Sequence, residues 1–300
     1  MTTESIGLRI RDAFADAGAR GWLHARPVPQ TSDAREVAVD ADEMIPLASV
    51  YKLPLLIAFA QAVDAKQLDP RARTTLAPKD RMGGSSVGIA SMLDPVTISW
   101  RDLAASMITV SDNAAAEALY RKIGPDTIAA SMSSLGLANT VVHGTAHDEL
   151  RSLARTTKAR TAEAALQTLA SNDARAQLRY NVLSRSFSTP RDLTALLDAL
   201  WTGRAASQRQ CRFARGLLTT SAGPNRLRSG FPFDDVIVAS KSGTFGALRH
   251  DVGVIVYPGE SPVAVAVMTE AARSDRLLPE VDAVIGRAAR LAVGHIRGAR

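Results

Sequence analysis

The chain reads Ala48-Ser49-Val50-Tyr51-Lys52-Leu53-Pro54-Leu55-Leu56-Ile57-Ala58-Phe59-Ala60, a polar entrance followed by unbroken apolar sequence. Because the apolar part is too continuous for an exposed amphipathic helix, it predicts a helix that is buried on nearly all sides. Ser49 and Lys52 are three residues apart, so on a helix they share one face and touch. The run therefore predicts a serine beside a lysine at the entrance of a buried helix.

This pair of side chains is a candidate for nucleophilic catalysis. A serine hydroxyl is a poor nucleophile until a nearby base takes its proton. A lysine that is partly buried, or crowded by another cation, has a pKa low enough for that task. A helix N-terminus adds free N–H groups and a partial positive charge beside Ser49. The alternative is that Ser49 only caps the helix, so the motif needs partners elsewhere in the chain.

Composition bounds the class of protein. The 300 residues are 46% hydrophobic and 22% charged, which suits a globular chain with a sizeable core. The formal charge is +6, from 30 arginines and 6 lysines against 30 acidic residues. The arginines are scattered and aromatic residues are only 5%, so the sequence predicts no nucleic-acid partner. The mild positive field favours an anionic small-molecule substrate.

Cysteine usage and the N-terminal sequence bear on cofactors and location. Cys211 is the single cysteine, so no internal disulfide can form and no cysteine-based metal site is expected. The sequence predicts neither a metal nor another cofactor. Residues 1–20 contain no apolar block of signal-peptide length. No later segment approaches the roughly 20 apolar residues of a membrane span, so we expect a cytoplasmic protein without membrane contact.

Hydrophobic periodicity and breaker residues divide the chain into a helical middle between two β-rich ends. The first part predicts a helix over residues 6–17 and strands over 21–28 and 35–39. The last part predicts strands over 236–240, 249–257 and 263–269, then a helix over 278–296. This order indicates the α/β class, of the α+β type, with one sheet built from both chain ends.

The helical middle carries several start signals. Ser99 with Asp102 predicts a capped helix from residue 100, and Thr189 predicts the cap of a helix that opens with Pro190. Ser111-Asp112-Asn113 interrupts the helical pattern. We expect a loop over residues 139–149 and helical structure over 152–179.

Three short motifs follow one another along the chain. They are Ser49-Val50-Tyr51-Lys52, Ser111-Asp112-Asn113 and Lys241-Ser242-Gly243-Thr244, at a helix start, at a break between helices and on a strand. With these motifs in this order, the sequence resembles the class A serine β-lactamases and the penicillin-binding peptidases. The resemblance spans nearly the whole chain and includes Thr189-Pro190-Arg191-Asp192-Leu193 and Asp251-Val252-Gly253-Val254.

The resemblance implies a fold. It is the β-lactamase-like fold, an antiparallel sheet flanked by helices plus a helical subdomain, with the site in the cleft between the two parts. On this chain the α/β subdomain would comprise about residues 1–65 and 222–300, and the helical subdomain about 66–221, within one catalytic domain.

The resemblance also implies roles for the motif residues. Ser49 attacks an acyl carbonyl, and Lys52 receives or relays the proton. Ser111 lies on the proton path to the leaving nitrogen, and the N–H groups of Ser49 and Thr244 form the oxyanion hole. Asn113 binds a substrate amide and Lys52, while Lys241 and Ser242 bind a substrate carboxylate. Asp112 is expected to brace its turn.

One loop departs from the family pattern. In the resembled enzymes a glutamate in the pattern Glu-x-x-Leu-Asn activates the water that releases the acyl group. If Leu150 matches that leucine, His147 stands in the place of the glutamate and Arg151 in that of the asparagine. Glu149 could be a displaced substitute, or either residue could be an ordinary solvated side chain. The segment 152–186 also looks inserted.

The sequence therefore predicts a serine hydrolase that works through an acyl-Ser49 intermediate on a lactam, amide or ester, with slow release of the acyl group. Three alternatives stay open. They are a genuine class A β-lactamase, a biosynthetic or metabolic esterase, and a non-turnover protein that traps acyl groups.

Overall fold

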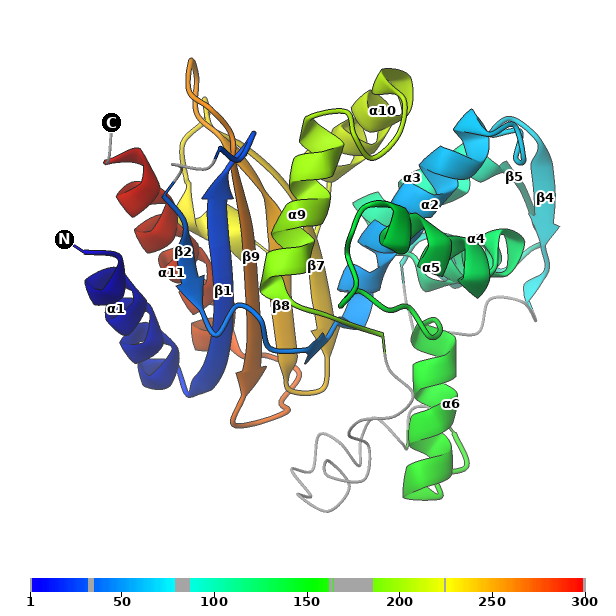
Figure 1. Ribbon diagram of the computed structural model, residues 1–300. Coiled ribbons are helices and arrows are strands. Elements are labelled where there is room, and N and C mark those ends of the chain that lie inside the picture. Colours follow the sequence, from blue (N-terminus) through cyan, green and yellow to red (C-terminus); the bar gives the residue numbers. More distant parts are fainter. Residues whose placement is uncertain are drawn as a thin grey trace.

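The computed structural model describes residues 2–31, 35–78, 87–161, 164, 186–223 and 225–298. Its centre is a five-stranded antiparallel sheet with the strand order β2-β1-β9-β8-β7 (Figure 1). The strands are β1 (Ala19–Pro27), β2 (Val37–Val39), β7 (Ile237–Phe245), β8 (Leu248–Val256) and β9 (Val263–Ala271). Because β1 from the start of the chain pairs with β9 from its end, both chain ends build one sheet, as predicted.

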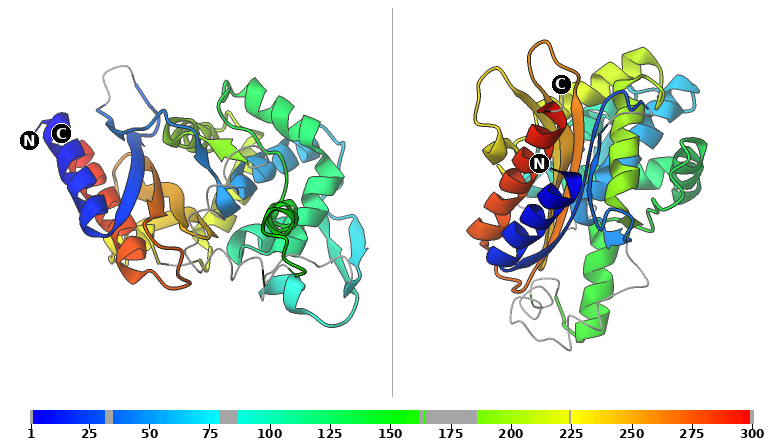
Figure 2. Two further views of the ribbon diagram at one scale, coloured as in Figure 1. Left: turned by 90° about the horizontal axis from the view of Figure 1, so that it is seen from below. Right: turned by 60° about the vertical axis from the view of Figure 1, so that its left-hand side comes forward.

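Two helices from opposite ends of the chain cover one face of this sheet. They are α1 (Thr3–Asp16) and α11 (Pro279–Arg297), which pack against each other (Figure 2). Ile10 and Phe14 of α1 and Val284 and Ile285 of α11 are buried in one apolar cluster with side chains of the sheet. This packing explains the apolar spacing of both helices.

The opposite face of the sheet carries the helical part of the molecule. Helix α9 (Pro190–Trp201) lies against β1, β8 and β9. Beyond it lie α2 (Lys52–Asp64), α3 (Trp100–Thr109), α4 (Asn113–Ile123), α5 (Pro125–Ser134), α6 (Ala146–Thr157) and α10 (Gln208–Thr219) (Figure 1). Helix α2 is buried from Lys52 to Ala60 without a break, which confirms the prediction from its continuous apolar run.

Short elements connect these layers. They are the 3₁₀ turns η1 (Ala48–Tyr51), η3 (Gly88–Ser91) and η4 (Leu227–Gly230), and the two-stranded pairs β3 (Ile45–Pro46) with β6 (Phe187–Ser188) and β4 (Arg73–Leu76) with β5 (Val96–Ser99). The sequence analysis predicted none of the four short strands.

The predicted helix caps are confirmed. The Oγ of Ser99 accepts a hydrogen bond from the N–H of Asp102 at 3.2 Å. The Oγ1 of Thr189 accepts from the N–H of Asp192 at 3.0 Å, and Pro190 is the first helical residue. In both helices a side chain satisfies a backbone donor that the first turn leaves unpaired.

Two predictions around α6 are wrong. The loop expected over residues 139–149 ends early, because α6 begins at Ala146 behind a capping box of Thr145 and Asp148. The helix expected from residue 152 does not continue to 179. It ends at Thr157, since Lys158 takes a left-handed backbone conformation with φ of 56°. Most of the remaining predicted segment lies outside the described residues.

Two helices pack across the predicted boundary between the subdomains. The prediction assigns α2 to the α/β subdomain, but α2 packs against α3, α4, α5 and α10 of the helical part. It assigns α9 to the helical subdomain, but α9 packs on the sheet. The division itself stays a prediction.

In the described ranges, no helix is long and apolar enough to cross a membrane. The cytoplasmic location stays a prediction.

Candidate active site

The three motifs meet between the edge strand of the sheet and the helical part. Ser49 lies in the turn η1, and α2 begins three residues later at Lys52. Ser111 lies in the break between α3 and α4, and Lys241 lies on β7, at the edge of the sheet. Strand β7 packs against η1, so residues about 190 positions apart in the sequence become neighbours.

Lys52 lies at the centre of the site and contacts residues of the first two motifs. Its side chain is 0% exposed. The Nζ lies 3.5 Å from the Oγ of Ser49 and 3.2 Å from the Oγ of Ser111. It donates to the backbone carbonyl of Ser111 and to the Oδ1 of Asn113, each at 2.7 Å. One nitrogen therefore links the first two motifs.

Ser111 connects Lys52 to the third motif. The Nζ of Lys241 donates to the Oγ of Ser111 at 3.0 Å and to the carbonyl of Ser242 at 2.8 Å. Ser111 has a left-handed φ of 57°, which is uncommon for a residue with a side chain and costs on the order of 1–3 kcal/mol. This conformation aims its hydroxyl between the two lysines.

The turn that holds Ser111 is braced by Asp112. Its carboxylate is fully buried and accepts hydrogen bonds from the N–H groups of Ala114, Ala115 and Ile89 and from the hydroxyl of Ser106. The four bonds satisfy both carboxylate oxygens. Asp112 thus braces the turn, as the sequence analysis expected.

Burial controls the electrostatics of both lysines. Burial, and next the positive charge of Lys241, hold the pKa of Lys52 well below its usual value. Burial lowers the pKa of Lys241 to about 8, partly offset by the carboxylate of Asp251. An ammonium group in an apolar surrounding loses hydration, and two neighbouring ammonium groups repel, so the neutral form is favoured. The lowered pKa favours the neutral form of Lys52, which is the form that can act as a base.

The strand side of the site depends on a glycine. A Cβ on Gly243 would lie 2.9 Å from the carbonyl oxygen of Leu47 and 3.0 Å from a methyl group of Val50. Only a glycine lets β7 come this close to the turn that carries Ser49. Ser242 is buried beside it, and Thr244 is exposed.

The sequence analysis missed Arg226, which supports this strand from behind. Its guanidinium is 2% exposed and donates to the carbonyls of Gly243 and His250, at 2.7 and 3.0 Å, and to the Oγ1 of Thr244 at 2.8 Å. Its Nε donates to Asp282 of α11 at 2.6 Å. Arg226 thus fixes the backbone on which Thr244 presents its N–H.

The two candidate deacylating bases, His147 and Glu149, lie in the first turn of α6 and have different neighbours. His147 accepts a hydrogen bond from the Nε of Arg151 at 3.0 Å, and its Nδ1 lies 3.9 Å from Glu117. Glu149 is 7% exposed, and its negative charge acts on Lys52, where it raises the pKa against the effect of burial. The negative charge of Glu149 therefore acts on Lys52, while the contacts of His147 are with Arg151 and Glu117.

Tyr51 and Glu117 hold the start of α6 in place. The Tyr51 hydroxyl accepts a hydrogen bond from the N–H of Ala146 at 3.4 Å, and Glu117 accepts one from the hydroxyl of Thr145. The capping pattern of Thr145 with Asp148 was the signal from which this helix start could have been predicted. Within the part of the chain that the structure describes, no group of His, Cys, Asp and Glu residues could hold a metal ion.

Comparison with known proteins now assigns the family. The family model described as "Beta-lactamase enzyme family" matches residues 7–296. The chain belongs to the β-lactamase enzyme family. A carbapenem-hydrolysing β-lactamase of Klebsiella oxytoca is 30% identical, and the match covers 88% of this chain and 80% of that protein. A β-lactamase regulatory protein of Streptomyces cacaoi is 26% identical over 97% of both chains.

Solved structures show the same fold for this β-lactamase-family chain. A β-lactamase of Sphaerobacter thermophilus superposes with a TM-score of 0.78 at 23% identity, over 99% of this chain and 98% of its own. The structure of a protein named PBP-A gives a TM-score of 0.78 at 19% identity, over 98% and 96%. The β-lactamase-like fold predicted from the sequence is confirmed. Family membership supports a serine β-lactamase-like hydrolase that acts on a small molecule.

Proposed function

We propose that this protein is a serine hydrolase that forms an acyl-enzyme on Ser49 with lactam, amide or ester substrates that carry an anionic group. The observation that carries the proposal is the buried, charge-suppressed Nζ of Lys52, 3.5 Å from the Oγ of Ser49 and 3.2 Å from that of Ser111. Nucleophile, base and proton path are thereby joined in one chain of contacts.

Acylation then proceeds in two proton transfers. As the Oγ of Ser49 bonds to the substrate carbonyl carbon, its proton passes to the neutral Nζ of Lys52. When the bond from that carbon to the leaving group breaks, the leaving nitrogen or oxygen takes a proton from the Oγ of Ser111. Lys52 resupplies Ser111 across their 3.2 Å contact, so the proton count balances and Lys52 returns to its neutral form.

Substrate binding uses the remaining motif residues. The N–H groups of Ser49 and Thr244 donate to the developing oxyanion, at about 3 kcal/mol for each donor. The Oδ1 of Asn113 accepts from Lys52 at 2.7 Å, and the amide of Asn113 donates to a substrate carbonyl when the substrate binds. Lys241 and the hydroxyl of Ser242 bind the anionic end of the substrate.

For the release of the acyl group we propose Glu149 as the base. Its charge acts on Lys52, whereas His147 is engaged with Arg151. A carboxylate there would take a proton from the attacking water. Glu149 is displaced by two residues from the family pattern, so we propose slow turnover rather than efficient β-lactamase action.

A second candidate function is an acyl trap without useful turnover. It is favoured by the displaced base and by the likeness to PBP-A and to a relative named as a regulatory protein. The third and fourth candidate functions are a genuine class A β-lactamase and an esterase. Time-resolved turnover of a chromogenic cephalosporin and of an ester panel separates these four functions.

Intact-mass spectrometry tests the central proposal. Incubation with a penicillin should add the mass of one penicillin, and the Ser49→Ala variant should remain unmodified. The free energy of unfolding of Ser49→Ala should stay within about 1 kcal/mol of the wild type, because the Ser49 hydroxyl caps no helix and its hydrogen bond to Lys52 is long, at 3.5 Å. Ser134→Ala, an exposed serine of α5, serves as the matched control and should acylate normally. An adduct of equal yield in Ser49→Ala would refute the assignment.

A further inference from the structure

A small apolar cluster joins helix α6 to strand β7. Leu153 of α6 is fully buried and packs against Ala154, Ala159 and Phe245. Among the residues that the structure describes, Leu153 belongs to neither of the two large apolar clusters of the molecule. Phe245 is the last residue of β7, so this cluster, here called the α6 anchor, connects two elements that are far apart in the sequence.

Strand β7 presents the ring of Phe245 on the side of the proposed active site. Side chains alternate along a strand, so Phe245 shares a face of β7 with Lys241, and Thr244 points to the opposite face. The bond from Arg226 to the Oγ1 of Thr244 lies on that opposite face. Phe245 is also paired with Leu248 of β8, which fixes its backbone at the end of the hairpin.

Helix α6 carries Glu149 and Leu153 on one face. The two residues are four positions apart, and side chains with this spacing are neighbours on the surface of a helix. Both are buried, with 7% of Glu149 and 0% of Leu153 exposed. The negative charge of Glu149 acts on Lys52. Because the backbone of one helical turn is hydrogen-bonded throughout, a contact that fixes Leu153 also fixes the direction in which Glu149 points.

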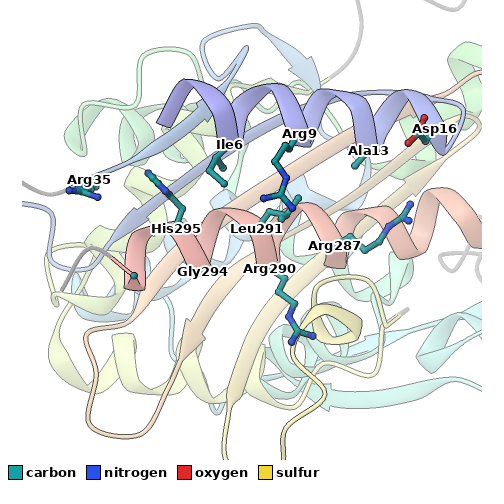
Figure 3. A pocket seen from close by; sticks show the side chains of 11 residues that line it. Ile6, Arg9, Ala13, Asp16, Arg35, Arg287, Arg290, Leu291, Gly294 and His295 are labelled. Atoms are coloured by element: carbon teal, nitrogen blue, oxygen red, sulfur yellow. The ribbon is translucent and has the colours of Figure 1, made fainter. Parts of the chain in front are cut away.

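Helix α6 is attached to the molecule differently from helices α1 and α11. Those two pack on the sheet and on each other, and side chains of both line a cleft of about 680 Å³ between them (Figure 3). Helix α6 extends away from the other helices (Figures 1 and 2). Its start is held by Tyr51 and Glu117, and the α6 anchor holds its second half. A side chain of the sheet therefore supports a helix that projects from the molecule.

We propose that Phe245 is a positioning residue for the release of the acyl group from Ser49. Through the α6 anchor it holds Glu149, the proposed base, at a fixed place relative to β7. The residue before Phe245 is Thr244, whose N–H is the proposed donor to the oxyanion. This proposal rests on the proposed function, because it concerns the acyl-enzyme on Ser49.

The release step needs the base and the oxyanion donor at the same moment. The oxygen of a water molecule bonds to the carbonyl carbon of the acyl group, and one of its protons passes to the carboxylate of Glu149. The carbonyl oxygen meanwhile gains the charge that the N–H of Thr244 stabilises. The bond from that carbon to the Oγ of Ser49 then breaks, and the proton passes from Glu149 to this oxygen. A shift of α6 relative to β7 separates the base from the donor and slows the step.

The lifetime of the penicillin adduct, followed by intact mass on the full chain, tests the proposal. Leu153→Ala breaks the α6 anchor from the helix side and leaves β7 and Glu149 in the chain. We expect its adduct to form at the wild-type rate and to decay about tenfold more slowly, because the base is displaced. Phe245→Ala should slow the decay by the same factor. The double variant should decay no more slowly than either single variant, since both changes break one contact.

Two further variants separate positioning from loss of stability. Phe245→Leu keeps an apolar side chain against Leu153 and should restore most of the wild-type decay rate. Leu200→Ala is the matched control, because Leu200 of α9 is buried in a large apolar cluster away from α6. It loses the same side-chain atoms as Leu153→Ala and should leave the decay rate unchanged.

Backbone hydrogen exchange provides a readout that does not depend on acylation. The amides of residues 149–157 should exchange faster in Leu153→Ala and Phe245→Ala than in the wild type and in Leu200→Ala. Unchanged exchange, or faster exchange with an unchanged adduct lifetime, would overturn the proposal. So would effects on the lifetime that multiply in the double variant. A wild type that forms no adduct would refute the proposed function and the role in release together, while the exchange data would still show whether Phe245 holds α6.

Discussion

Two side chains of α6, two positions apart, compete for the role of deacylating base. Because the charge of Glu149 acts on Lys52, Glu149→Gln should prolong the penicillin adduct by about a hundredfold or more without slowing its formation. His147→Ala, which mainly removes the contact with Arg151, should leave the adduct lifetime within a few fold. A longer lifetime in His147→Ala alone would reverse the assignment. The measurement is the decay of the adduct by intact mass.

The lowered pKa of Lys241 predicts a pH dependence for anionic substrates. Its ammonium form exists below the pKa of about 8 and is lost as the pH rises through that value. The acylation efficiency kcat/KM for a substrate with a carboxylate should therefore fall above about pH 8. A neutral ester with the same acyl group should show a smaller fall. Parallel losses for both substrates would mean that Lys241 acts mainly by suppressing the charge of Lys52.

Individual residues of the site differ in how far the sequence reveals them. Ser49 and Lys52 can be paired from their spacing alone, because a helix brings residues three apart into contact. Arg226 cannot be predicted in this way. Two of its partners are backbone carbonyls on β7 and β8, 17 and 24 residues away, and no side-chain pattern encodes such bonds. Its side-chain partners, Thr244 and Asp282, are 18 and 56 residues away, so their spacing does not indicate a pairing either.

At the scale of elements, the cap of α6 should control deacylation. Thr145→Ala removes the bonds to Asp148 and Glu117 that hold the helix start, at a cost of about 1 kcal/mol in unfolding free energy. We expect slower decay of the adduct, because Glu149 loses its fixed position. Thr189→Ala removes the cap of α9 and is the matched control: it should lose similar stability and leave the decay rate unchanged. Equal effects of both variants on decay would show that the cap matters only for folding.

Elements also differ in how predictable they are. The strands β8 and β9 are buried on both faces, which their short apolar runs indicate, and α11 follows from its helical period because it buries one apolar face. The strands β3 and β6 contain two residues each and exist only through pairing with each other. Such strands have no period of their own, so tertiary contacts decide them. The end of α6 depends on the left-handed backbone conformation of Lys158. Glycine or asparagine usually takes this conformation at a helix end, and the sequence has neither at this position.

Across the whole molecule, Arg226 connects the covering helices to the proposed active site. It bonds Asp282 of α11 on one side and the Gly243 carbonyl of β7 on the other. The turn η4 follows Arg226 directly and packs against α11. The position of β7, which carries the proposed oxyanion-binding N–H of Thr244, therefore depends on how closely α11 approaches η4.

This dependence predicts different effects for two glycines of α11. A Cβ on Gly286 would lie 2.6 Å from the carbonyl oxygen of Arg226, and also from the N–H nitrogen of Gly230, whereas Gly294 faces open space. Gly286→Ala should therefore push η4 away, lower the unfolding free energy by about 1–3 kcal/mol and slow the acylation of Ser49 by about tenfold. Gly294→Ala should raise stability by about 0.5–1 kcal/mol and leave acylation unchanged. Denaturant unfolding and the rate of adduct formation measure both. If Gly286→Ala lost stability but acylated at the wild-type rate, α11 would support only the fold, and Arg226 would not transmit its position to Thr244.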